Sequence, residues 1–448
     1  MNKSPIDCIV RVVLTCLVLA GLPALTSADE LLMPVQKDPA TCGACHQRIY
    51  REWKSSSMAK TIDNPIVYQF YTGTNPKGEK DGIGYQGMHP GQAGDCADCH
   101  VPQLTLDEHT QGREVDLGRA MQDKLDYGIS CHFCHTLDHV KLEKDAAGRY
   151  KTRLFETVTQ DAQGHIQGPF KKTVAPHGAT YNGLYKSSEL CGACHLNQEK
   201  FLSISTYADW KQAYDTGVIK ETCEDCHMPL LKGKQEVAVG APMRDGLRAH
   251  TFIGARDPGL LEKALTLKVD AQAIAGILTV KTTVENVGAG HRVPGSGPIR
   301  NVILKVDVTD ESGKPLEYTG DAHGLLPSLA GMGNSKTKTR DAQDWAGMPG
   351  KMYAKVYQSA IMPNGQKTVG VGGFAADSIF FDTTLAPKKP DQMNFMFKLP
   401  ADYRGKINIS ARLVYRWAFK PLIDSKGWIL DDRPMTQVEK TLNTKGLD

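Results

Sequence analysis

Two cysteines and a histidine recur at one fixed spacing in five places along the chain. Each copy reads Cys-x-x-Cys-His, and ten of the twelve cysteines belong to one. The copies are Cys42, Cys45 and His46; Cys96, Cys99 and His100; Cys131, Cys134 and His135; Cys191, Cys194 and His195; and Cys223, Cys226 and His227. A shuffled chain of this composition would contain the pattern roughly 0.01 times, so the five copies indicate one shared chemistry.

This spacing is typical of covalent attachment of haem c. Two residues three apart lie on one side of a helical turn, where their thiols can form thioethers with the two vinyl groups on one edge of a porphyrin. The residue after the second cysteine then points its imidazole at the iron as the proximal ligand. The sequence therefore predicts five covalently bound haem c groups.

Three other uses of the motif explain the pattern less well. Structural zinc takes four ligands, and the fifteen motif residues do not divide into fours. Disulfides are common in exported proteins, but they leave the histidine after every second cysteine unexplained. A thioredoxin-like dithiol usually occurs once in a chain.

The first 28 residues differ in composition from the rest of the chain. Lys3 and Arg11 flank a short positive region, an apolar run follows, and the small residues Thr26 and Ala28 close the segment. This pattern predicts a secretory signal peptide cleaved near Ala28 and a protein without a membrane anchor after cleavage. We expect a periplasmic location, with the cell surface as the alternative. The formal net charge of +3 over 448 residues argues against binding of nucleic acid.

Residues 29–263 are expected to form a pentahaem domain of short helices and long connections that pack against porphyrin. The motifs indicate a duplication within it, because "TCGACH" at Thr41 recurs as "LCGACH" at Leu190, and "DCADCHVP" at Asp95 recurs as "TCEDCHMP" at Thr222. The stretch from 140 to 174 alternates apolar and polar residues between glycines, which predicts a hairpin excursion.

Residues 264–448 contain no cysteine and change to a period of two. The segments "LTLKV", "GILTVKTTVEN", "NVILKVDVTD", "NFMFKL" and "KINISARLVYRW" carry this alternation, and turn signals such as "ESGK" and "PNGQ" lie between some of them. They predict an antiparallel β-sandwich of about seven strands, with long loops between 323 and 377. The predicted fold class is therefore α+β, with a haem domain followed by an accessory sandwich.

Several longer stretches resemble the cytochrome c554 (cytochrome c-552/4) family of multihaem c-type cytochromes. They are "CGACHQRIYREWKSSSMAKT", "YGISCHFCHT", "TYADWKQAYDTGVIKETCEDCHMP", "LRAHTFIGARDPGLL" and "NVGAGHRVPGSGPIRNV". The resemblance covers roughly residues 38 to 302, and its haem-binding part is the most specific. It implies an exported electron carrier with closely stacked haems, most of them six-coordinate.

Five residues outside the motifs are candidate sixth ligands to iron. His250, in "RAHTF", matches a family position for an axial ligand. His291 lies on a glycine-rich loop between two predicted strands, so iron binding there would lock the two domains together. His177 and His89 are further candidates. Met58 stands where many relatives have histidine, and methionine ligation raises the haem potential.

The remaining histidines are weaker candidates. His132 lies inside a motif and could reach only a neighbouring haem. His109 and His139 carry little support, and His165 and His323 are typical of solvated loop residues.

The pattern favours an electron carrier over a catalyst. Its partners would be other redox proteins, either a quinol oxidase module or other cytochromes. The alternative is a multihaem oxidoreductase that acts on a small nitrogen or sulfur compound, or on peroxide, at an iron with an open distal side. All five motifs end in histidine, whereas one class of nitrite reductase has a lysine-ligated haem. A third hypothesis makes the sandwich a docking module for a larger redox assembly.

Overall fold

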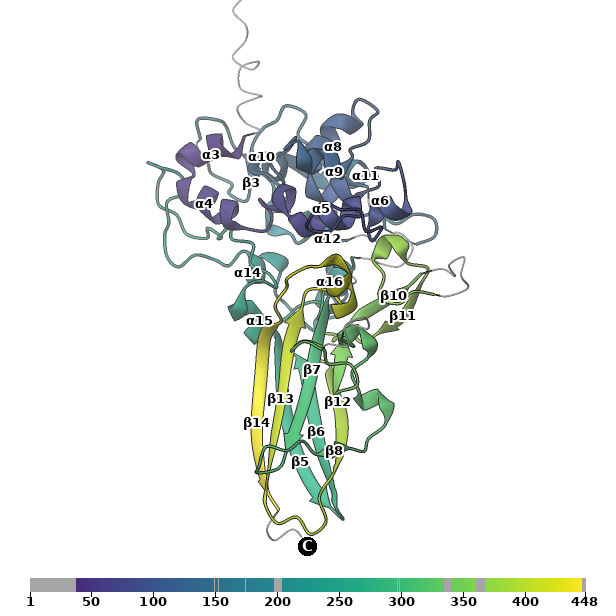
Figure 1. Cartoon of the computed structure of the whole chain (residues 1–448). Helices are drawn as coiled ribbons and strands as arrows, with labels where there is room; N and C mark the ends of the chain where they lie inside the picture. Colours follow the sequence, from purple (N-terminus) through teal and green to yellow (C-terminus); the bar gives the residue numbers. More distant parts are fainter. Residues whose placement is uncertain are drawn as a thin grey trace, which may run out of the picture.

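The computed structural model describes residues 38–148, 150–151, 153–173, 175–196, 204–295, 297, 299–333, 340–359 and 367–444. Short helices gather at one end of the molecule, and long antiparallel strands extend from them to the other end (Figure 1). This arrangement confirms the predicted α+β class, with the haem motifs in the helical part and antiparallel sheets in the C-terminal part. The predicted signal peptide lies outside the described residues.

Each of the five motifs forms its own short helix. The motif helices are α3 (Pro39–Cys45), α7 (Cys96–His100), α10 (Cys131–His135), α12 (Glu189–His195) and α14 (Cys223–His227). The other helices are α4 (Gln47–Ser55), α5 (Pro65–Thr72), α6 (Tyr85–Met88), α8 (Pro102–His109), α9 (Leu117–Gln122), α11 (Leu154–Thr157), α13 (Thr206–Asp215), α15 (Pro258–Ala264) and α16 (Lys420–Lys426). Five single 3₁₀ turns are η1 (Thr61–Asp63), η2 (Gly183–Lys186), η3 (Ala322–Gly324), η4 (Ser328–Ala330) and η5 (Gly373–Ala375).

Polar side chains start several of the motif helices. Asp38 accepts a hydrogen bond from the amide of Ala40 at the start of α3. Ser130 caps α10, and Thr222 forms a reciprocal capping box with Asp225 at the start of α14. An N-cap of this kind satisfies amides that have no partner inside the helix. In the third and fifth motifs, the residue just before the first cysteine therefore helps to set the turn that aligns the motif.

The hairpin predicted between 140 and 174 is not formed as such: the two short strands inside this stretch pair with strands at or beyond its ends. Strand β1 (Leu137–Val140) pairs antiparallel with β2 (Val158–Gln160), and α11 lies between them in sequence. Strand β3 (Gln167–Gly168) pairs parallel with β4 (Thr180–Tyr181).

The C-terminal part contains two four-stranded sheets. One has the order β5-β6-β12-β8 and the other the order β14-β13-β7-β9. The strands are β5 (Leu265–Ile274), β6 (Ile277–Asn286), β7 (Asn301–Thr309), β8 (Glu317–Tyr318), β9 (Gly350–Tyr353), β12 (Pro390–Lys398), β13 (Lys406–Arg416) and β14 (Arg433–Asn443). Both sheets contribute to one apolar core, in which Val280 and Phe395 of the first meet Leu304 and Ile409 of the second.

The strand predictions hold for five long strands and fail elsewhere. The five predicted segments correspond to β5, β6, β7, β12 and β13. Strand β14 was not predicted, because nearly all of its side chains stay at least partly exposed. The segment from 323 to 377, expected as loops, contains β9 and β10 (Lys355–Gln358), and β10 pairs with β11 (Ser378–Asp382).

Helix α16 joins the sheets to the helical part. The fully buried ammonium of Lys426 donates to the carbonyl oxygens of Gln69 and Thr74 at 3.2 and 3.1 Å, and to Oδ1 of Asp81 at 2.9 Å. The indole of Trp428 donates to Oε1 of Gln69 at 2.6 Å. These contacts fix the position of the sheets against α5.

No helix in the described part of the chain combines the length and the apolar character that a membrane span requires.

Replacing Lys426 with methionine should destabilise the contact between the two parts. The change leaves the partly buried Asp81 without its cation, and breaking a buried pair in this way costs about 3–5 kcal/mol. The midpoint of urea unfolding should fall, whereas Lys440→Ala, which removes an exposed pair with Asp270, should cost about 0–1 kcal/mol. Equal midpoints for the two variants would contradict this role of Lys426.

Candidate functional site

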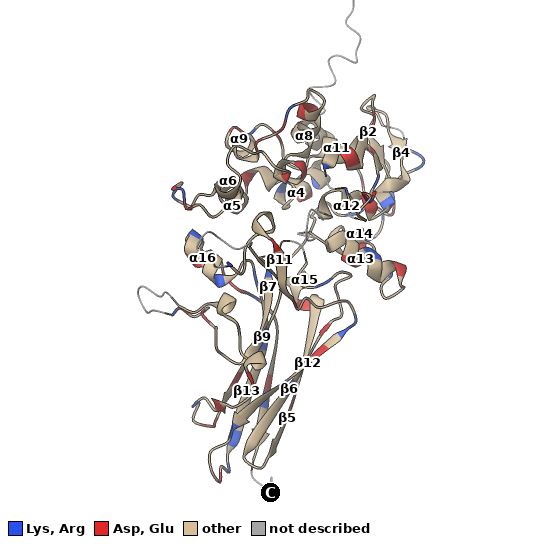
Figure 2. Ribbon diagram, turned by 90° about the vertical axis from the view of Figure 1, so that its right-hand side faces the viewer, with Lys and Arg blue, Asp and Glu red and all other residues tan. Residues whose placement is uncertain are grey.

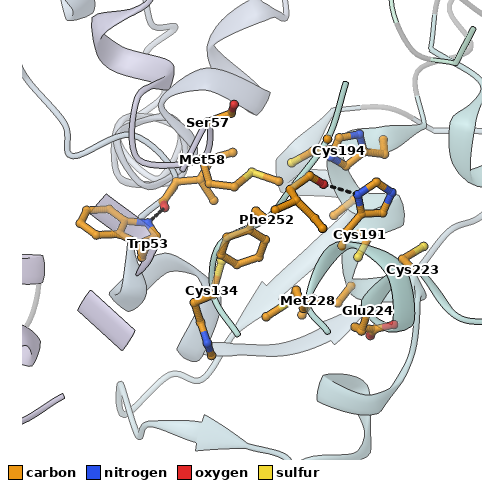
Figure 3. Close-up of a pocket in the computed structure, with 18 of the residues that line it drawn as sticks. Trp53, Ser57, Met58, Cys134, Cys191, Cys194, Cys223, Glu224, Met228 and Phe252 are labelled. Carbon is orange, nitrogen blue, oxygen red and sulfur yellow. Dashed lines mark hydrogen bonds between the residues drawn. The ribbon is translucent and has the colours of Figure 1, made fainter. Parts of the chain in front are cut away.

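All five motifs face one cavity of 2510 Å³. All ten motif cysteines and all five motif histidines line it. A pocket for one small molecule usually measures about 300–1,000 Å³, so this cavity is large enough for several bulky groups. Cysteines from different motif helices lie around it together (Figure 3).

Hydrogen bonds orient three of the motif histidines toward the cavity. Nδ1 of His46 donates to the carbonyl oxygen of Val237 at 2.9 Å, and Nδ1 of His135 donates to that of Gln167 at 2.7 Å. Nδ1 of His227 donates to the carbonyl oxygen of Ile253 at 2.5 Å. A carbonyl oxygen can only accept, so Nδ1 carries the hydrogen and Nε2 keeps the lone pair that binds a metal.

Burial lowers the pKa of three of the lining imidazoles, which keeps them neutral. It lowers the pKa of His100 to about 4. Burial, with neighbouring histidines as a lesser cause, also lowers the pKa values of His195 and His250 to about 4. An imidazole binds a metal only in its neutral form. These three side chains are therefore ready to bind iron at pH 7.

Two histidine pairs have the spacing of axial ligands on opposite sides of one metal ion. The ring centres of His46 and His177 lie 6.2 Å apart, and those of His135 and His250 lie 6.4 Å apart. A metal–imidazole bond measures about 2 Å, which separates the ring centres of two trans imidazoles by about 6 Å. Nδ1 of His177 donates to the carbonyl of Gly178, and Nδ1 of His250 to that of Arg248. Nε2 therefore keeps its lone pair in both.

His291 reaches the cavity from the loop between β6 and β7. Nδ1 donates to the carbonyl oxygen of Arg292 at 2.8 Å, as Nδ1 of His177 and of His250 donates to a nearby carbonyl. His195 and His227 both lie within electrostatic range of its ring. The loop packs tightly, because a Cβ at Gly290 would lie 2.7 Å from Cδ1 of Ile219.

His89 and Met58 also line the cavity. The ring of His89 is not paired with the ring of a motif histidine in the described residues. Nε2 of His89 donates to the carbonyl oxygen of Phe374 at 3.1 Å, so this nitrogen already has a partner. Met58 extends into the cavity near Trp53 (Figure 3). Both remain candidate ligands on position alone.

The other histidines have different surroundings. His132 lines the cavity, but its Nδ1 contacts Oε1 of Gln103 at 3.2 Å. The ring of His109 stacks on Phe155 at 3.7 Å. The remaining three lie outside the cavity lining and are exposed: His139, His165 and His323.

Contacts between cysteines give the spatial order of the motifs. The thiol of Cys42 in the first motif contacts that of Cys131 in the third, and Cys191 in the fourth contacts Cys223 in the fifth. Cys99 in the second motif lies with its sulfur 3.7 Å from the carbonyl oxygen of Cys194. Cys134 and Cys194 are also close enough to interact electrostatically. The motifs therefore follow the order first, third, fourth, fifth, with the second beside the fourth.

The charged side chains of the lining were missed by sequence reasoning. Eight basic and four acidic residues line the cavity. The basic residues are Arg153, Lys186, Lys220, Arg244, Arg248, Arg256, Arg300 and Lys388, and the acidic residues are Asp95, Glu221, Glu224 and Asp225. This excess of positive charge complements the two propionates of each haem. The thiols, the neutral imidazoles and the lining charges together fit haem c. No local pattern marks these basic residues, because they come from distant segments.

Comparison with known proteins gives a family match and matches among solved structures. Residues 41–136 match the family model described as cytochrome c554 and c-prime. No curated protein matches the chain. Among solved structures, a penta-heme cytochrome c552 from Thermochromatium tepidum is similar with a TM-score of 0.63 and 18% identity. The match covers 91% of this chain and 100% of the other, so the two share their fold.

Alanine in place of His177, His250 or His291 should leave one iron without its sixth ligand in each variant. Electron paramagnetic resonance of the oxidised holoprotein should then show one haem changed from low spin to high spin. His323→Ala serves as the control, because this exposed side chain does not line the cavity. A ligand variant whose spectrum equals that of the control would exclude that residue as a ligand.

Proposed function

We propose that the chain is an exported electron carrier with five haems, a multihaem c-type cytochrome similar to the cytochrome c554 family, whose model matches residues 41–136. Haem c supplies reversible one-electron transfer when bound. The ten motif cysteines would hold the five groups, and His46, His100, His135, His195 and His227 would be the proximal ligands.

The continuous order of the motifs is the observation that carries this proposal. Each motif has a cysteine in contact with, or close to, a cysteine of the next one. Groups attached at neighbouring cysteines must lie close together, which is what electron exchange between them requires. A series of neighbouring groups suits a protein that passes electrons from one group to the next.

The histidine pairs support the same function. His177 opposite His46 and His250 opposite His135 would give two irons with both axial positions filled. A filled iron has no open position for a substrate, and its potential is then set by its ligands and its burial. His291 would fill a third iron, at His195 or His227, and would couple the sheets to the helical part.

The predicted signal peptide supports a periplasmic location, and the carrier would exchange electrons with other redox proteins. A quinol oxidase module or other cytochromes are suitable partners. Assembly into a larger redox complex is compatible with the exposed sheets.

A second candidate function, a small-molecule oxidoreductase, is favoured by the surroundings of the second motif. Nδ1 of His100 is buried without a hydrogen-bond partner. In the described residues no imidazole faces His100 as His177 faces His46. An iron held there would have an open side unless Met58 or His89 fills it.

Protein-film voltammetry of the holoprotein separates the two functions. A carrier should give reversible electron uptake and release that stays unchanged when nitrite, hydroxylamine or peroxide is added. A catalytic current with any of these compounds would contradict the carrier proposal and favour the oxidoreductase.

A further inference from the structure

Two segments around the first motif together have a larger net positive charge than the complete chain. Residues 162–188 and 228–247 contain six basic and two acidic residues, a net charge of +4, whereas the complete chain has a net charge of +3. The basic residues are Lys171, Lys172, Lys186, Lys232, Lys234 and Arg244. Positive charge is therefore concentrated on a small part of the helical region, and ribbon segments coloured blue for lysine and arginine lie beside β4 (Figure 2).

Both segments lie directly against the first motif. The first segment places His177 opposite His46. The second provides the carbonyl of Val237, which accepts from His46, and the amide of Val239, which donates to the carbonyl oxygen of Cys45 at 2.9 Å. This positive surface thus borders one particular motif.

Arg244 holds the two segments together. Its guanidinium lies 4.6 Å from the ring centre of Phe170, and NH2 donates to the carbonyl oxygen of Lys172 at 3.2 Å. The backbone of Arg244 pairs with Gln235, the residue after Lys234. The lysines of the second segment are thereby brought near those of the first.

Four of these lysines are free to meet a partner. Lys171, Lys172, Lys232 and Lys234 are exposed and do not line the cavity, unlike Lys186 and Arg244. We call these four lysines the basic face. They are not placed to bind the propionates of a buried haem, so their charge points to a partner outside the chain.

Exposed apolar side chains accompany the basic face. Val239, whose amide contacts Cys45, is 62% exposed, and Met243, in the same turn between Gln235 and Arg244, is 57% exposed. Cys45 is itself exposed, whereas the other nine motif cysteines are only partly exposed. An apolar centre with a charged rim is the usual composition of a protein–protein interface.

We propose that a negatively charged electron-transfer protein docks on the basic face and exchanges electrons at the first motif. This inference rests on the proposed carrier function. Clustered charge of one sign raises the association rate of a partner of the opposite sign. The first motif also stands at one end of the motif order, where a partner has access. A partner that docks at this end can exchange electrons with the whole series of haems.

The test uses flavodoxin, a small acidic flavoprotein, as the probe partner of the holoprotein. Stopped-flow measurement at low salt should show that Lys171→Glu/Lys172→Glu and Lys232→Glu/Lys234→Glu each lower the second-order rate of haem reduction by reduced flavodoxin about tenfold or more. Binding of oxidised flavodoxin, measured by calorimetry, should weaken in parallel. Raising the ionic strength should remove the difference, because salt screens exposed charges.

The control is Lys268→Glu/Lys281→Glu, which makes the same charge change on exposed positions of β5 and β6. It should retain rates and affinity close to those of the unaltered protein. Equal effects of the control and the basic-face variants, or no effect of salt, would overturn the docking proposal. Reduction by a neutral small-molecule reductant should be complete in every variant. Its failure in the unaltered protein would instead contradict the carrier function.

Discussion

Every other feature of the helical part depends on the alignment of two thiols and one imidazole within a single helical turn. Five such turns, α3, α7, α10, α12 and α14, surround one cavity, and their own apolar clusters are small. The connections between them act mainly through backbone carbonyls, such as those of Val237 and Gln167, which orient the imidazoles. Because short helices cannot bury enough apolar surface by themselves, the groups held in the cavity would serve as the core of this region.

The sheets also contribute residues to the cavity and to the contact with the helical part. The two sheets share one apolar core. In addition, the loop after β6 brings His291 to the cavity, and α16 places Lys426 beside α5. A ligand on a loop anchored by two strands of a rigid sheet is held more precisely than one on a long connection. If His291 binds iron as proposed, the position of the sheets would bear on iron coordination as well as on stability.

The sequence predicts the motifs and the long strands because each depends on local spacing, three residues in a helical turn or two in a strand. It does not decide between candidate ligands, since His46 and His177 are 131 residues apart and meet only through tertiary packing. The hydrogen bonds that set the tautomers come from backbone carbonyls and leave no side-chain pattern. Strand β14 escapes prediction because most of its residues are polar and nearly all of them stay at least partly exposed, and β9 is too short for its alternation to be visible. The family resemblance adds His250, which no local pattern identifies.

Mass spectrometry of the intact mature protein, produced in a host that attaches haem c, tests the central claim most directly. The account predicts a mass equal to the polypeptide after Ala28 plus five haem groups, with no free thiol left to react with an alkylating reagent. A mass with fewer than five additions, or cysteines that react as free thiols or disulfides, would contradict it.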